Sequence, residues 1–135
     1  EFILIVEDEA MLSEMALEIL RESGYRTLAA SSAKQTLEIW QQHRGEIDLV
    51  LTAVVMTEGI SGTDLAGQLV AENPRLKIVF MSGYTSHEMS QELLQSLNAS
   101  FIAKPYGHAD LVKIVRNSLD KLPAATGKAA PERTA

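Results

Sequence analysis

The stretch DLVLTAVVMTEGISG, residues 48–62, runs from an apolar strand into a turn that contains glycine. A short apolar run followed by a segment of helical period, from about Gly62 to Glu72, is typical of a strand–helix unit in an α/β fold. The helix is expected to stop before Pro74, because proline disfavours the helical conformation of the residue before it. The surroundings of Ala53 suit a reactive carboxylate at the strand end, yet this residue carries only a methyl group.

Four further strand–helix units flank this stretch. The strands are expected at residues 2–6, 25–30, 47–52, 76–82 and 99–103. The helices are expected at residues 11–23, from 32 onward, 62–72, from 85 to about 97, and 108–122. Capping boxes, Ser32 with Gln35 and Thr85 with Glu88, are predicted to open the second and fourth helices. Strict alternation of strands and helices predicts one parallel sheet with helices on both faces.

The composition is that of a single globular domain. The chain has 135 residues, of which 46 % are hydrophobic and 22 % charged, so it can bury a real core. Its net charge of −6 argues against nucleic-acid binding, because the phosphates would be repelled. No stretch approaches the roughly 20 apolar residues that span a bilayer. The absence of cysteine fits a reducing cytosol, so we expect a cytoplasmic protein with no membrane contact.

The two ends of the chain differ from its centre. Residues 123–135 are rich in Ala, Thr, Gly, Lys and Pro, and we expect them to form a disordered tail or linker. The first residues begin almost directly on a strand, which suggests a piece of a longer protein.

Polar side chains follow the first, fourth and fifth expected strands. Glu7, Asp8 and Glu9 follow the first strand, Ser82 ends the fourth, and Lys104 follows the fifth. In parallel sheets of this kind the ligand site lies at the carboxyl ends of the strands. Paired acids suit Mg²⁺, and a lysine can hold a phosphoryl oxygen as a point charge. Each feature alone could serve only a helix start, a turn or a loop, but their ordered placement favours one shared site.

The chain resembles the receiver domain, the phosphoacceptor module of two-component response regulators and hybrid histidine kinases. The resemblance covers residues 2–122 and rests on the segments ILIVEDE, DLVLT(x)VVM, GISGTDLA, IVFMSGYT and FIAKPY, in this order. It implies a receiver domain over residues 1–122 with a flavodoxin-like (βα)5 fold, a doubly wound parallel sheet of strand order 2-1-3-4-5. The segments VVM, EGISG and MSGYT are most similar to receivers attached to hybrid histidine kinases.

The resemblance also implies a metal site. Glu7 and Asp8 match the acidic pair that binds Mg²⁺, with Asp8 the stronger candidate for the direct ligand and Glu7 acting through water. The backbone carbonyl of Val55 would complete the protein's share of the ligands.

Three further residues match the family's switching and phosphoryl-binding positions. Ser82 matches the hydroxyl that moves onto a bound phosphoryl group, Phe101 the aromatic rotamer switch, and Lys104 the lysine of the family motif. The partner-binding face would be the fourth helix, fifth strand and fifth helix, about residues 86–122. Met89, Leu93 and His108 are candidate contacts there, for a partner or for a homodimer.

Ala53 occupies the position of the family's phosphorylatable aspartate. The family reaction moves a phosphoryl group from a phosphohistidine, on a histidine kinase or phosphotransfer protein, to that carboxylate. A methyl group supplies neither a nucleophile nor a metal ligand. We therefore expect no phosphotransfer at Ala53, weakened Mg²⁺ binding and no enzymatic activity.

Neighbouring residues offer no clear substitute for the missing acceptor. Asp48 lies roughly 16 Å upstream along an extended strand, and Thr52 should point to the opposite face of the sheet. Thr57 and Glu58 are closer in the following loop, but nothing in the sequence positions them. Ala53 is then either an introduced substitution or a natural loss, and a natural loss would suit a pseudo-receiver that acts through binding alone.

Two enzyme classes remain as alternatives. A haloacid-dehalogenase-like phosphatase would need an Asp-x-Asp pattern after the first strand, where the second position is Ala10. A flavin- or dinucleotide-binding fold would need a phosphate loop rich in glycine or hydroxyl groups at that place. The sequence EDEAM has repelling carboxylates there instead.

Overall fold

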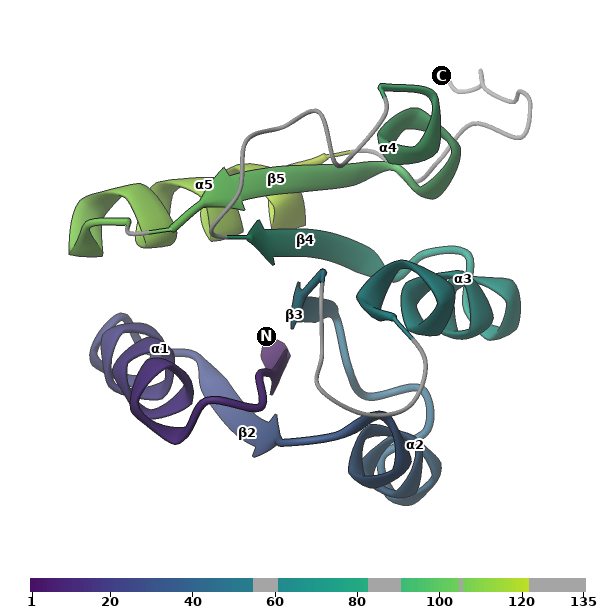
Figure 1. Ribbon diagram of the computed structural model, residues 1–135, viewed down its shortest axis with the longest axis horizontal. Helices are drawn as coiled ribbons and strands as arrows, with labels where there is room; N and C mark the ends of the chain where they lie inside the picture. The colour runs from purple at the N-terminus through teal and green to yellow at the C-terminus, as the bar shows by residue number, and fades with distance from the viewer. Residues whose placement is uncertain (55–60, 83–90, 105, 122–135) are drawn as a thin grey trace.

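The computed structural model describes residues 1–54, 61–82, 91–104 and 106–121, and within them five parallel strands form one sheet. The strand order is β2-β1-β3-β4-β5, which confirms the predicted fold class and topology (Figure 1). The strands are β1 (Phe2–Val6), β2 (Arg26–Ala30), β3 (Leu49–Ala53), β4 (Lys77–Ser82) and β5 (Ala99–Ala103). The helices are α1 (Ala10–Glu22), α2 (Ala33–Gln42), α3 (Gly62–Glu72), α4 (Gln91–Leu97) and α5 (His108–Asp120).

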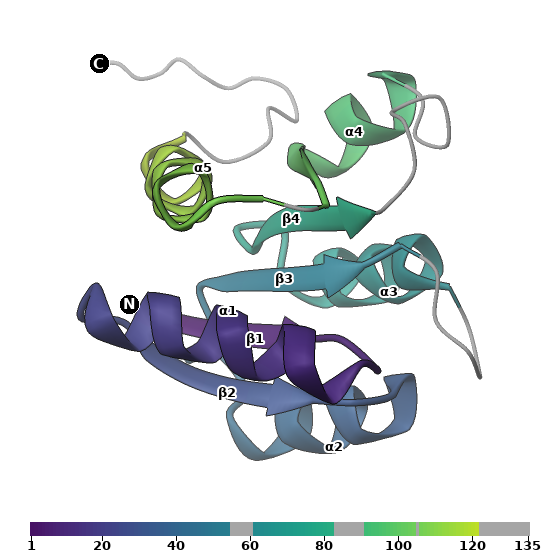
Figure 2. The same ribbon diagram turned by 60° about the vertical axis from the view of Figure 1, so that its left-hand side comes forward.

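Helices cover both faces of the sheet, and each face has its own apolar core. Helices α1 and α5 pack on one face, over alternate residues of the central strands such as Ile5 and Leu51. Helices α2, α3 and α4 pack on the other face, over the intervening residues such as Leu4 and Val50 (Figure 2). Burial on both faces explains why β1, β3 and β4 are continuous apolar runs rather than alternating ones.

Several predicted boundaries shift by one or two residues. The third strand was expected to end at Thr52, but it includes Ala53 because Ala53 pairs with Met81 of β4. The last helix ends at Asp120 rather than at residue 122. The predicted capping box of Ser32 with Gln35 forms only in part. Ser32 Oγ accepts from the backbone N–H of Gln35 at 3.1 Å, as predicted, but Gln35 Oε1 accepts from the N–H of Ser31 rather than of Ser32.

Some expectations lie outside the described residues. These are the capping box of Thr85 with Glu88 and the tail at residues 123–135. In the described part of the chain, no helix combines the length and apolar character that a bilayer span requires.

Gly62, the first residue of α3, fixes how closely this helix approaches the end of β3. Its N–H donates to the carbonyl oxygen of Val54 at 2.8 Å. A Cβ atom built at this position would overlap the carbonyl oxygen of Ala53. Only glycine therefore allows α3 to begin directly beside the last residue of β3.

Candidate functional site

The carboxyl ends of β1, β3, β4 and β5 are aligned at one edge of the sheet by the parallel register. Glu7 follows β1 directly, Ala53 and Ser82 are the last residues of β3 and β4, and Lys104 follows β5. The positions that the sequence predicted as one site thus share this edge, which we call the carboxyl edge.

A buried ion pair at the carboxyl edge joins Lys104 to Glu7. Lys104 Nζ lies 2.7 Å from Glu7 Oε1, and the Glu7 side chain is 2 % exposed. The second oxygen, Glu7 Oε2, accepts a hydrogen bond from the backbone N–H of Glu9 at 3.1 Å. The backbone N–H of Lys104 donates to the carbonyl oxygen of Ser82 at 2.7 Å. Lys104 is therefore held at its backbone and at its ammonium group.

Ala53 is buried, with 2 % of its surface exposed. It lies level with Met81 in the neighbouring strand, and the next residue, Val54, donates its N–H to Met81 O at 3.0 Å. Thr52 points away toward α3, as strand alternation predicts, and its Oγ1 donates to the carbonyl oxygen of Ala53 at 3.0 Å. The methyl group of Ala53 is thus part of the packed edge rather than an open position.

Tyr106 is a further residue at this edge that the residue-by-residue prediction did not assign. Its hydroxyl donates to Met81 Sδ at 3.6 Å, and Met81 is the residue that pairs with Ala53. Burial, with a smaller contribution from the negative charge of Glu7, raises the pKa of Tyr106. The segment FIAKPY contained Tyr106, but only its contact with Met81 indicates a place in the site.

The other predicted residues lie at or near the same edge. Ser82 is buried, and Asp8 is half-buried beside Glu7. Phe101 is half-buried, pairs with Phe80 in register, and packs against the core on the α4 side.

The predicted metal ligands form an incomplete donor set. Among residues 1–54, 61–82, 91–104 and 106–121, no three Asp, Glu, His or Cys side chains gather. Both carboxylate oxygens of Glu7 accept hydrogen bonds from the chain's own groups, and Val55 lies outside the described residues. Mg²⁺ demands an octahedral set of oxygens and usually takes one or two carboxylates. The described residues alone therefore supply only part of a magnesium site.

Two of the three predicted partner-binding residues, Leu93 and His108, lie in the described part of the chain. Leu93 is half-buried and packs against the core, so it is not a free contact. His108 is exposed at the start of α5, with its Nε2 3.6 Å from Glu22 Oε1. Met89 lies outside the described residues.

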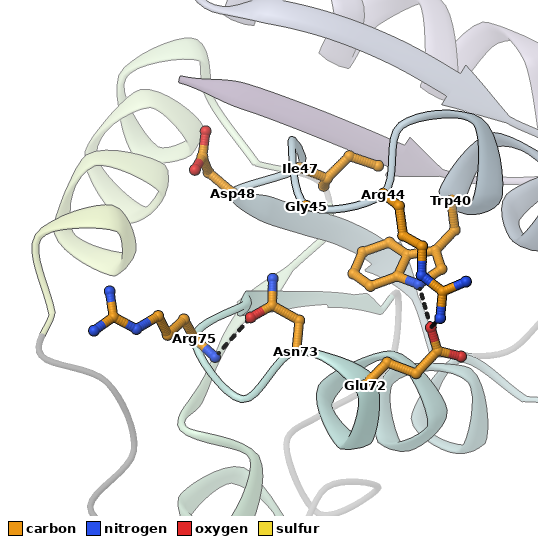
Figure 3. Close-up of a pocket in the computed structure, with 8 residues that line it drawn as sticks. All are labelled: Trp40, Arg44, Gly45, Ile47, Asp48, Glu72, Asn73 and Arg75. Atoms are coloured by element: carbon orange, nitrogen blue, oxygen red, sulfur yellow. Dashed lines mark hydrogen bonds and ion pairs between the residues drawn. The ribbon is translucent and has the colours of Figure 1, made fainter.

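The opposite end of the sheet, which we call the amino edge, has a different kind of polar cluster. An open groove of about 590 Å³ lies between the end of α2 and the end of α3 (Figure 3). Glu72 Oε1 accepts from the buried Trp40 Nε1 at 2.8 Å and from Arg44 Nη2 at 3.2 Å. Asp48, just before β3, accepts from the backbone N–H of Phe2 at 2.8 Å. Asp48 therefore lies far from Ala53, as the sequence predicted.

The model of the response regulator receiver domain matches residues 3–116 of this chain. The chain belongs to the receiver domain family. This receiver domain is 32 % identical to the sensor kinase CckA of Brucella abortus (strain 2308) over 119 residues, 88 % of the chain but only 12 % of CckA. It is 26 % identical to the response regulator receiver protein CpdR of the same organism, over 87 % of the chain and 95 % of CpdR.

Solved structures agree with this assignment. The receiver domain of the hybrid histidine kinase CckA superposes with a TM-score of 0.74 at 28 % identity, covering 89 % of this chain and all of that one. The response regulator TrrA of Thermotoga maritima, solved in complex with Mg²⁺-BeF, superposes with a TM-score of 0.75 at 28 % identity. That match covers 87 % of this chain and 97 % of TrrA. Membership of this family of signalling modules replaces the phosphatase and dinucleotide-binding alternatives.

Proposed function

We propose that this chain is a receiver domain of a two-component phosphorelay whose phosphoacceptor position, Ala53, cannot be phosphorylated. The observation that carries the proposal is the place of Ala53: the last residue of β3, at the same edge as Glu7, Ser82 and Lys104. An acyl phosphate requires a carboxylate oxygen there to attack the phosphorus atom. A buried methyl group has no such oxygen.

The remaining assignments follow the same pattern and are part of the proposal. Ser82 and Lys104 would be the phosphoryl-binding groups, and Phe101 the aromatic switch. Asp8, Glu7 and the carbonyl of Val55 occupy the metal-binding positions of the family. We expect Mg²⁺ binding to be weakened, to the point of no measurable effect on the unchanged chain, because Ala53 removes one anionic ligand and Lys104 already pairs with Glu7. The partners would be a histidine kinase or a phosphotransfer protein in the cytoplasm.

The similarity to CckA supports a receiver of the hybrid-kinase type. Since this chain corresponds to only 12 % of CckA, the kinase activity, signal and output of the longer protein are not carried over.

Intact-mass measurement tests the proposal. The chain and its Ala53→Asp variant are incubated side by side with acetyl phosphate and Mg²⁺. We expect a phosphoryl group on the variant alone, which would mean that one residue holds an otherwise competent site inactive. A phosphoryl group on the Ala53 chain would contradict the proposal, because another residue would then be the acceptor.

A second candidate is a pseudo-receiver that works as a phosphorylation-independent interaction module. The intact pair of Lys104 with Glu7 favours it, because the buried carboxylate of Glu7 is neutralised without a metal ion or a phosphoryl group. In this case neither protein would gain mass, and both would bind the same phosphotransfer protein with equal affinity. A homodimer through α4, β5 and α5 is one form of such a module, and light scattering over a range of concentrations would reveal it.

A further inference from the structure

The charge of Glu7 at the carboxyl edge is balanced by a group that belongs to the chain itself. A buried carboxylate such as Glu7 needs a positive partner, because removal from water strongly disfavours the charged form. In receiver domains a divalent cation is the expected partner of this acidic pair. In this structure the ammonium group of Lys104, 18 % exposed, lies 2.7 Å from Glu7 Oε1.

Each carboxylate oxygen of Glu7 has a hydrogen-bond partner, and these contacts hold its side chain in place. One oxygen is held by Lys104 and the other by the N–H of Glu9 at 3.1 Å. The backbone N–H of Lys104 donates to the carbonyl oxygen of Ser82 at 2.7 Å, which fixes the point from which its side chain reaches Glu7. Ala53 offers no carboxylate that could draw Lys104 away from Glu7.

We infer that Lys104 takes the place of a divalent cation at the carboxyl edge, so that this domain keeps one metal-independent conformation. A metal ion that bound Glu7 Oε1 directly would have to displace the ammonium group, and Lys104 would then lose its anionic partner. The pair acts as a fixed internal counter-charge: Glu7 is neutralised with or without Mg²⁺. This inference goes beyond the proposed function, since it concerns the metal and not the acceptor.

Thermal unfolding of the full chain in increasing MgCl₂, at constant ionic strength, tests the inference without a phosphoryl donor or a kinase. We expect no saturable shift in the melting temperature of the unchanged chain. Lys104→Met keeps the length of the side chain but leaves Glu7 without its cation. This variant should melt lower than the unchanged chain in the absence of metal and should regain part of the loss as Mg²⁺ is added.

Lys113→Met is the matched control, because Lys113 is exposed on α5 and its loss changes the net charge by the same amount. The control should behave as the unchanged chain does. A saturable Mg²⁺-induced rise in the melting temperature of the unchanged chain would overturn the inference. So would a Lys104→Met variant that folds but shows no greater response to Mg²⁺ than the control.

A measurement on the unchanged chain keeps the inference testable if Lys104→Met does not fold. Mn²⁺ is titrated while the amide signals of Asp8 and Glu9 are followed by NMR. Non-selective broadening is expected, equal to that of other surface amides. Selective and saturable broadening at Asp8 and Glu9 would show that a metal binds beside the ion pair, and the inference would fail. Neither result depends on whether Ala53 can be phosphorylated.

Discussion

The two edges of the sheet use polar groups in different ways. At the amino edge polar side chains connect elements that lie next to one another: Trp40 and Arg44 bind Glu72, and Asp48 binds the N–H of Phe2. Lys77 Nζ, at the start of β4, donates to the carbonyl oxygen of Lys121 at the end of α5.

At the carboxyl edge polar groups from separate strands converge instead. The pair of Glu7 with Lys104 brings together residues that follow the first and the last strand. The comparison indicates that the amino edge serves stability through hydrogen bonds between neighbouring elements of the fold. The carboxyl edge depends on charges that meet at one place, and single substitutions there should change the response to metal as well as the stability.

The largest expected effect comes from Gly62→Ala, which tests how tightly the carboxyl edge is packed. The new methyl group would overlap the carbonyl oxygen of Ala53, so α3 would have to move away from β3. We expect the free energy of unfolding to fall by about 3 kcal/mol in urea denaturation, the upper range for overpacking.

Gly67→Ala is the control for this substitution. Gly67 lies in the same helix, and a Cβ atom there would meet nothing within 4 Å. Since alanine is the better helix former, this variant should be more stable by roughly 0.5–1 kcal/mol. Equal losses in the two variants would show that the close approach at Gly62 is not the cause.

Ala53→Asp gives the next largest effect, in the absence of metal. The new carboxylate would be buried close to Glu7, and like charge together with burial should raise its pKa. We expect a loss of about 1–2 kcal/mol at neutral pH. The loss should disappear on acidification. Below the unfolded pKa of the new carboxyl group, this group is protonated and uncharged in both the folded and the unfolded chain. A metal-free variant that melts clearly above the unchanged chain would contradict this expectation.

Lys77→Met tests the amino edge and should give the smallest effect. Burial, and then the positive charges of Lys121 and Arg75, lowers the pKa of Lys77 below its ordinary value of 10.5. Between the lowered pKa and 10.5 the unfolded chain binds more protons, so Lys77 makes stability rise with pH in that window. Removing the lysine should therefore flatten the rise in denaturant midpoint on the alkaline side. An identical pH profile in both proteins would show that burial does not lower the pKa of Lys77 enough to affect stability.

The sequence predicted the fold because its apolar runs are unambiguous. β1, β3 and β4 are buried on both faces, and such strands are recognisable from continuous apolar residues. The boundaries were less accurate because they depend on pairing with neighbours. Ala53 belongs to β3 only through its partner Met81, which is 28 residues away in the chain.

The site was predictable as a set of positions but not as a set of contacts. The ends of the strands placed Glu7, Ser82 and Lys104 at one edge, which the register confirms. The sequence could not show that Lys104 forms an ion pair with Glu7. That pairing depends on the length of the lysine side chain and on the burial of the carboxylate. For the same reason the sequence did not indicate the hydrogen bond from the Tyr106 hydroxyl to Met81 Sδ.

The bond between Lys104 and Glu7 also has a consequence for the order of events in folding. It joins residues separated by 97 positions, at the ends of the first and last strands. Two other strands, β3 and β4, lie between β1 and β5 in the sheet, so the bond can form only when all four are in place. We therefore expect this interaction to form after the transition state of folding. Its loss should therefore accelerate unfolding and leave the rate of folding nearly unchanged.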